Sequence, residues 1–126
     1  MERLFWICLA GAAGTGTRYL VAVWAAQRFG TAFPYGTLVV NLAGCFLIAV
    51  IMHTAFALSW SPTVRSALTV GFLGGLTTYS SFNYETTRLL QDGAPVVAAL
   101  NAIVTLVGCV AAGWLGLIAS KQLLAQ

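Results

Sequence analysis

Two long stretches of this sequence carry no formally charged residue, and they limit the possible folds more than any other feature. One lies between Arg28 and Arg65, and the other runs from Gly93 to Ser120. Each can supply the roughly 20 apolar residues that a transmembrane helix needs. Only 7% of the chain is charged, against about 25% in an ordinary soluble domain. We therefore predict an integral membrane protein.

The apolar runs and the breaks between them predict four helices, at about 4–26, 37–58, 63–90 and 96–120. Ser61 is the expected N-cap of the third helix, with Pro62 at its first position. Met1 to Gly16 has the charge and apolar run of a signal peptide, but the apolar character resumes after Arg18, which favours a longer spanning helix. The fold class is thus all-α, a single membrane domain over 1–126 with no room for a soluble catalytic domain.

The third predicted helix contains a segment that is poorly suited to a continuous helix. GFLGGLTTYSSF, residues 71–82, includes three glycines, two threonines and two serines. We expect the helix to break at Gly74 to Thr78. Inside a membrane such a break is tolerated only where protein or a water-filled cavity satisfies the freed backbone. The break therefore marks a candidate site.

The positions of the cations give only a weak preference for one orientation of the chain in the membrane. With four spans, one side of the membrane carries Arg3, Arg65 and Lys121, and the other carries Arg28 and Arg88. This difference is almost no positive-inside bias. We hypothesise that copies insert in both orientations and pair as an antiparallel dimer.

Two charged residues lie within predicted spans, where a charge costs about 2.5–3.5 kcal/mol on insertion scales. Arg18 is either an anchor that reaches toward the interface or a functional cation that faces an aqueous vestibule. Glu85 lies three residues before Arg88, on the same helical face, which predicts a local ion pair.

Three polar side chains in the second and fourth predicted helices have two interpretations. Thr37 and Asn41 lie one turn apart, and Asn101 lies early in the fourth helix. Such residues either join helices by hydrogen bonds or line a polar path. His53 has no second ligand nearby, which favours a hydrogen-bonded or interfacial residue over a proton relay.

Small residues in the predicted spans favour structural roles. Gly108, Ala112 and Gly116 repeat at every fourth position, a pattern typical of close helix packing. The three cysteines lie in apolar stretches without metal-binding spacing, so we interpret them as small hydrophobic residues. They are Cys8, Cys45 and Cys109.

Aromatic and hydroxyl side chains alternate directly after the predicted break. Tyr79 and Phe82 are three residues apart, with Ser80 and Ser81 between them. Rings alone usually indicate packing. The edge of an aromatic ring is electropositive, however, and hydroxyl donors can replace water around a small anion without trapping it.

The motifs of several enzyme and nucleic-acid-binding classes are missing. Gly14-Thr15-Gly16 has Tyr19 where a dinucleotide-binding fingerprint needs its third glycine, and no phosphate-binding loop is present. A single histidine and dispersed cations predict neither a familiar catalytic constellation nor a nucleic-acid surface. We expect a protein that is not an enzyme.

Three segments together carry a resemblance to a known family. They are GAAGTGTRY at 11–19, PYGTLVVNLAGCFLI at 34–48 and GFLGGLTTYSSFNYET at 71–86. The sequence resembles the Fluc (CrcB) family of small bacterial fluoride channels over essentially its whole length. The resemblance implies an antiparallel, dual-topology homodimer of four-helix protomers in the bacterial inner membrane. It also implies passive export of cytoplasmic fluoride, which relieves fluoride toxicity, with neither nucleotide nor nucleic acid as a partner.

The resemblance also assigns roles to individual positions. The pore residues would be Asn41, Tyr79, Phe82, Ser80, Ser81, Thr37 and Glu85, with Arg18 in the vestibule. Backbone carbonyls of Gly74 and Thr77 would hold a structural Na⁺ at the centre of the dimer. The sequence departs from the commonest family pattern at Tyr79, Ser81 and Asn83, where Phe, Thr and Ser are usual.

Two other classes remain as alternatives. A small dual-topology multidrug exporter coupled to protons would also have four helices, but it needs a membrane-embedded carboxylate in its first helix, where this chain has Arg18. A non-transporting scaffold subunit would need only the small-residue pattern, and it would not explain a polar break beside two rings.

Overall fold

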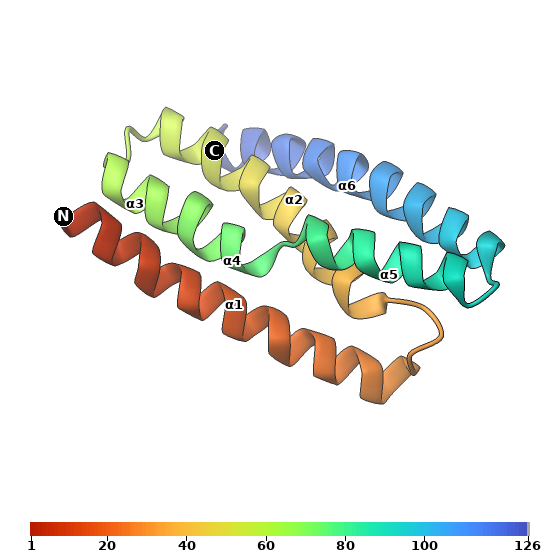
Figure 1. Cartoon of the computed structure of the whole chain (residues 1–126). Helices are drawn as coiled ribbons and strands as arrows, with labels where there is room; N and C mark the ends of the chain where they lie inside the picture. Colours follow the sequence, from red (N-terminus) through yellow and green to blue (C-terminus); the bar gives the residue numbers. More distant parts are fainter. Residues whose placement is uncertain (126) are drawn as a thin grey trace.

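The computed structural model describes residues 1–125, which form an all-α fold without strands in that range. The chain runs back and forth along the bundle in four passes. They are α1 (Glu2–Phe29), α2 (Tyr35–Ala57), an interrupted third pass and α6 (Pro95–Leu124). Figure 1 shows that both termini lie at the end of the bundle where α2 turns into the third pass. The all-α prediction with four helical passes is confirmed.

The third pass consists of several pieces. It comprises α3 (Pro62–Ser66), the π-helical turn η1 (Ala67–Leu73), α4 (Gly74–Leu76) and α5 (Tyr79–Gln91). Ser61 accepts a hydrogen bond from the Val64 N–H at 3.3 Å, and Pro62 occupies the first turn, as predicted. The π-helical turn was not predicted.

The predicted break lies at two threonines. Thr77 has φ −85° and ψ 155°, and Thr78 has φ −153° and ψ 117°. Both residues are therefore extended, and α5 starts again directly after them, so that α4 and α5 lie end to end in Figure 1. The helix ends later than the start of the expected Gly74–Thr78 segment, because Gly74 to Leu76 still form a helical turn.

Glycines allow α1 to approach the third pass at backbone distance. A Cβ atom on Gly71 would lie 2.6 Å from the Ile7 carbonyl oxygen, and one on Gly14 would overlap the Phe72 carbonyl. A Cβ atom on Gly75 would likewise overlap the Gly11 carbonyl. Gly11 and Gly14 of α1, with Gly71 and Gly75 of the third pass, therefore allow α1 to lie against the π-helical segment and α4.

The α2–α6 interface uses the predicted small-residue pattern. A Cβ atom on Gly108 would lie 2.8 Å from Leu42 Cδ2. A Cβ atom on Gly116 would overlap the Phe46 carbonyl and lie 3.1 Å from the Ala49 Cβ. The predicted close packing along this face is confirmed.

The buried core is small, and much of the outer surface is apolar. Val40, Leu73 and Leu76 form the core, whereas Trp114 on α6 is 67% exposed. By length and mean hydropathy, α2 and α6 could each cross a membrane, with values of 2.1 and 2.2. The other two predicted spans do not reach this criterion. Charged and small residues lower the mean hydropathy of α1, and the breaks divide the third pass into helices that are too short.

Candidate functional site

The side chain of Asn41 holds the backbone at the break. Its Oδ1 accepts a hydrogen bond from the Thr78 N–H at 2.8 Å, and its Nδ2 donates one to the Thr78 carbonyl at 3.0 Å. Asn41 and Thr78 are both buried. Two backbone groups that a continuous helix would pair internally are therefore satisfied by a single amide. Sequence reasoning identified Asn41 but not this partner.

The hydroxyl group of Thr78 starts α5. Thr78 Oγ1 accepts a hydrogen bond from the Ser81 N–H at 3.1 Å, the usual arrangement of an N-cap. It also donates to Ser81 Oγ at 3.1 Å and lies 3.2 Å from Ser80 Oγ. Ser80 and Ser81 thus belong to one hydroxyl cluster. Sequence reasoning omitted Thr78 from the candidate site, although its place directly before a helical run was the available indication.

The two aromatic rings of the predicted pore lie together on α5. The ring centroids of Tyr79 and Phe82 are 5.5 Å apart, with an angle of 48° between the planes. Both rings line a cavity of about 700 Å³ between the third pass, α2 and α6, and Asn41 and Thr78 contribute to the same cavity. Tyr79 is 80% exposed in the single chain. The structure therefore brings both rings and the amide to one cavity.

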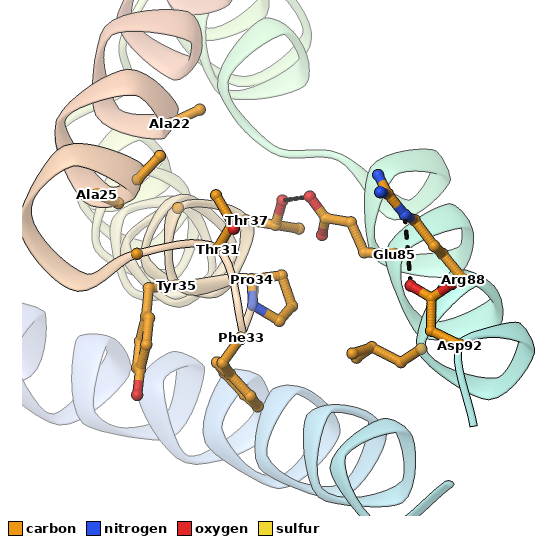
Figure 2. Close-up of a pocket in the computed structure, with 14 residues that line it drawn as sticks. Ala22, Ala25, Thr31, Phe33, Pro34, Tyr35, Thr37, Glu85, Arg88 and Asp92 are labelled. Carbon is orange, nitrogen blue, oxygen red and sulfur yellow. Dashed lines mark hydrogen bonds and ion pairs between the residues drawn. The ribbon is translucent and has the colours of Figure 1, made fainter. Parts of the chain in front are cut away.

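Glu85 pairs with α2 and not with its neighbour on α5. Thr37 Oγ1 donates a hydrogen bond to Glu85 Oε1 at 2.8 Å, as drawn in Figure 2. The expected Glu85–Arg88 ion pair is wrong, because Arg88 Nε lies 3.6 Å from Asp92 Oδ2 at the exposed end of the helix. Asp92 is one full turn from Arg88, whereas Glu85 faces the start of α2.

A second, smaller cavity places the predicted vestibule cation beside these groups. This cavity of about 270 Å³ is lined by Arg18, Thr37, Ser81 and Glu85. Thr78 also lines it, so the break separates this cavity from the cavity of the two rings. A cation and a carboxyl group therefore share one half-buried space.

A third cavity, of about 420 Å³, opens at the end of the bundle (Figure 2). The turn between α1 and α2 forms one wall, and Arg88 with Asp92 lies on the opposite side. Thr37 and Glu85 line both this cavity and the smaller one. Three neighbouring cavities thus follow one another along α5 and share lining residues.

The break also releases the two carbonyls expected to hold a cation. In a continuous helix the Thr78 N–H would donate to the Gly74 carbonyl, but it donates to Asn41. Likewise, the Ser81 N–H would donate to the Thr77 carbonyl, but it donates to Thr78 Oγ1. Both carbonyl oxygens therefore lose their helical donors. Hard cations bind oxygen ligands, backbone carbonyls among them, so these two groups are of a kind that suits a Na⁺ ion.

Asn101 and His53 have different surroundings. Asn101 Nδ2 donates to Thr86 Oγ1 at 2.9 Å and is almost fully buried, so it joins α6 to α5. The Nδ1 atom of His53 is buried without a hydrogen-bond partner among residues 1–125. This nitrogen therefore does not make the hydrogen bond that was one expectation for His53.

These features define a class of protein. An apolar outer surface surrounds an interrupted helix whose polar groups face cavities, the arrangement found where ions or solutes cross a membrane. Residues 5–117 match the family described as CrcB-like protein, Camphor Resistance (CrcB). The chain belongs to this family, and it is a membrane protein.

Several relatives align with most or nearly all of this chain. A "Fluoride-specific ion channel FluC" of Citrifermentans bemidjiense is 48% identical over 124 residues, which are 98% of this chain and all of that protein. The protein of the same name from Sorangium cellulosum is 49% identical over 126 residues, with 99% of each chain covered. The one from Anaeromyxobacter dehalogenans is 47% identical over 115 residues, 90% of this chain and 91% of the relative.

Proposed function

We propose that this chain is a fluoride-selective ion channel that lets cytoplasmic fluoride leave the cell down its electrochemical gradient. The observation that carries the proposal is the run of three cavities along α5. Thr37 and Glu85 line both the cavity at the end of the bundle and the smaller one, and Thr78 lines both the smaller cavity and the cavity of the two rings. The near-full-length similarity to fluoride-specific channels supports fluoride as the ion.

Each part of this route has a physical role in anion passage. Arg18 attracts an anion into the smaller cavity, where it also offsets the carboxyl group of Glu85. The hydroxyl of Ser81, with Ser80 in the same hydroxyl cluster, and the ring edges of Tyr79 and Phe82 supply weak donors in place of water. Weak, repeated contacts allow an ion both to enter and to leave. Conduction in this form involves no chemical step and no nucleotide.

Passive flow is sufficient for export. A cell interior that is negative by 100 mV favours the exit of one negative charge by about 2.3 kcal/mol. A channel with this selectivity would therefore lower cytoplasmic fluoride and relieve its toxicity without a coupling ion. For this the chain would lie in the bacterial inner membrane as a multi-pass protein.

We also propose that the channel is an antiparallel, dual-topology homodimer. The ends of the bundle differ little in positive charge, with Arg3, Arg65 and Lys121 at one end and Arg28 and Arg88 at the other. The cavity of the two rings is open in the single chain, and Tyr79 is 80% exposed there. A second copy that covers this face would remove Tyr79 from lipid. Tags at one terminus should become labelled from both sides of the membrane, and labelling from one side only would contradict the dual topology.

The Gly74 and Thr77 carbonyls would hold a structural Na⁺ ion. When bound, the ion supplies positive charge that compensates the freed carbonyl oxygens at the break. We expect purified protein to unfold at a higher temperature in Na⁺ than in a large organic cation at equal ionic strength. Equal unfolding temperatures would contradict the Na⁺ site without affecting the proposed conduction.

Growth of a bacterial host that lacks its own fluoride channel tests the cellular function. Expression of this chain should restore growth in fluoride-containing medium, and an equally expressed Phe82→Ile variant should restore it less. Failure of the well-expressed native chain to restore growth would contradict fluoride export.

A further inference from the structure

Two cysteines that are far apart in the sequence face one cavity. Cys45 on α2 and Cys109 on α6 are both free thiols with intermediate exposure. Both line the cavity of about 700 Å³ that also contains the rings of Tyr79 and Phe82. Cys8 on α1 is exposed and does not line this cavity. Nothing in the spacing of the cysteines along the sequence indicates this pairing.

Cys45 and Cys109 lie where α2 and α6 pack against each other. At Gly113, which is one turn after Cys109, an added Cβ atom would be only 3.6 Å from the Cys45 carbonyl. The close packing of the two helices therefore places both cysteines on facing turns beside one accessible cavity.

A pair of adjacent thiols selects ions by coordination number and charge. Thiolates prefer soft cations, whereas Zn²⁺ usually takes four protein ligands in a structural site. Among the described residues, no group of three or more His, Cys, Asp or Glu side chains could complete such a site. A divalent cation that accepts two ligands would form a neutral bis-thiolate, which an apolar surrounding tolerates better than a charged complex.

We propose that Cys45 and Cys109 form a dithiol binding site for a two-coordinate thiophilic cation, of which Hg²⁺ is the test ion. On binding, both S–H bonds break, two S–Hg bonds form and two protons leave to water. No electron is transferred, so neither an oxidant nor a reductant is needed. The two thiols act together because the first bond holds the ion beside the second sulfur at high effective concentration.

The position of the site has a consequence for conduction, which rests on the proposed channel function. An ion held by Cys45 and Cys109 would occupy the cavity that Tyr79 and Phe82 line. We expect Hg²⁺ to stop fluoride efflux in the native protein. A dithiol should reverse this block, whereas glutathione, which offers one thiol, should not.

Retention of mercury by the purified full-length protein tests the binding site directly. Native protein is treated with Hg²⁺, washed with excess glutathione and measured for bound mercury per protomer. We expect the native protein and the matched control Cys8→Ser to retain a single ion. Cys45→Ser and Cys109→Ser should each lose it, because a lone thiol exchanges with glutathione.

Several outcomes would overturn the proposal. Native protein that retains no mercury, or Cys109→Ser protein that retains as much as the native protein, would contradict a two-cysteine site. If serine at position 45 or 109 prevents folding, Cys45→Ala and Cys109→Ala provide the same test. The binding assay does not depend on transport, so protein that binds mercury but carries no fluoride would contradict the channel and leave the dithiol site supported.

Discussion

Helix α2 takes part in two interfaces of opposite character. Against α6 it meets glycines, and Gly116 allows the backbone of α6 to approach the Phe46 carbonyl. Against the third pass it offers polar side chains, with Thr37 bonded to Glu85 and Asn41 bonded to Thr78. The contact of α2 with α6 thus depends on close packing of complementary shapes, whereas its contact with the third pass depends on hydrogen bonds.

The two interfaces of α2 therefore have different roles: the contact with α6 stabilises the fold, and the contact with the third pass shapes the candidate site. Close packing of α2 and α6 fixes their positions relative to each other. Hydrogen bonds from α2 then hold the third pass in a form that its own backbone could not maintain, since the extended residues Thr77 and Thr78 interrupt the helical ladder. Changes at the polar face should therefore affect conduction, and changes at the packed face should affect stability.

The largest effect is expected for Asn41→Asp. The carboxylate could still accept from the Thr78 N–H, but it would place a second oxygen against the Thr78 carbonyl, now 3.0 Å from Asn41 Nδ2. A buried charge that no cation compensates costs about 3–5 kcal/mol, and it would also repel a permeating anion. We expect loss of fluoride efflux from liposomes. Asn83→Asp, at an exposed position on α5, is the matched control. Normal efflux in Asn41→Asp would remove Asn41 from the site.

Gly116→Val should instead lower stability by disturbing the contact between α2 and α6. The added side chain would overlap the Phe46 carbonyl, and overpacking of this kind destabilises by about 1–3 kcal/mol. Thermal unfolding in detergent should show a lower midpoint. A Cβ atom on Gly16 would meet no atom within 4 Å. Gly16→Ala therefore serves as the control and should unfold at the native midpoint or above it, because alanine favours a helix more than glycine does. An unchanged midpoint in Gly116→Val would contradict the close α2–α6 contact.

Phe82→Ile should slow conduction while the fold is retained. The substitution removes the ring that lies 5.5 Å from Tyr79 and with it one electropositive edge in the cavity. A ring pair contributes about 0.5–1.5 kcal/mol beyond its buried area. A change of this size in the barrier to the anion would slow efflux roughly twofold to thirteenfold. Phe5→Ile on the exposed part of α1 is the control. Native flux in a well-folded Phe82→Ile protein would show that the ring only packs.

The smallest effect is expected for Thr37→Val, which removes the donor to Glu85 Oε1. A hydrogen bond of this kind contributes about 0.5–1.5 kcal/mol, and water in the adjoining cavity can replace part of it. Efflux should fall roughly threefold, and Glu85→Gln, which keeps an acceptor, should fall less. The exposed Thr17→Val provides a comparison on α1. A larger loss in Glu85→Gln than in Thr37→Val would indicate that Glu85 acts through its charge and not through this bond.

Much of the fold could be predicted from local composition. The charge-free stretches indicated α2 and α6, Ser61 and Pro62 indicated the start of α3, and the Gly and Thr content of 71–82 indicated the break. The exact place of the break could not be predicted, because it depends on Asn41, which is 37 residues away from Thr78 in the sequence. The π-helical turn was missed for a related reason, since the glycine contacts of α1 come from a distant segment.

The candidate site was predicted as a set of residues but not as an arrangement. Sequence spacing placed Glu85 beside Arg88, yet the carboxyl group bonds to Thr37. It also separated Cys45 from Cys109, which line one cavity from α2 and α6. In each case the partner comes from another helix, so the helical periodicity of a single segment carries no information about it.

Fluoride efflux from liposomes is the most direct test of the central claim. Purified protein is reconstituted in fluoride-loaded liposomes, a K⁺ ionophore compensates the charge, and an external electrode follows fluoride, with chloride as the comparison. We predict rapid fluoride efflux without chloride efflux and without dependence on a proton gradient. Well-folded protein that releases no fluoride, or that does so only with a proton gradient, would contradict a passive fluoride channel.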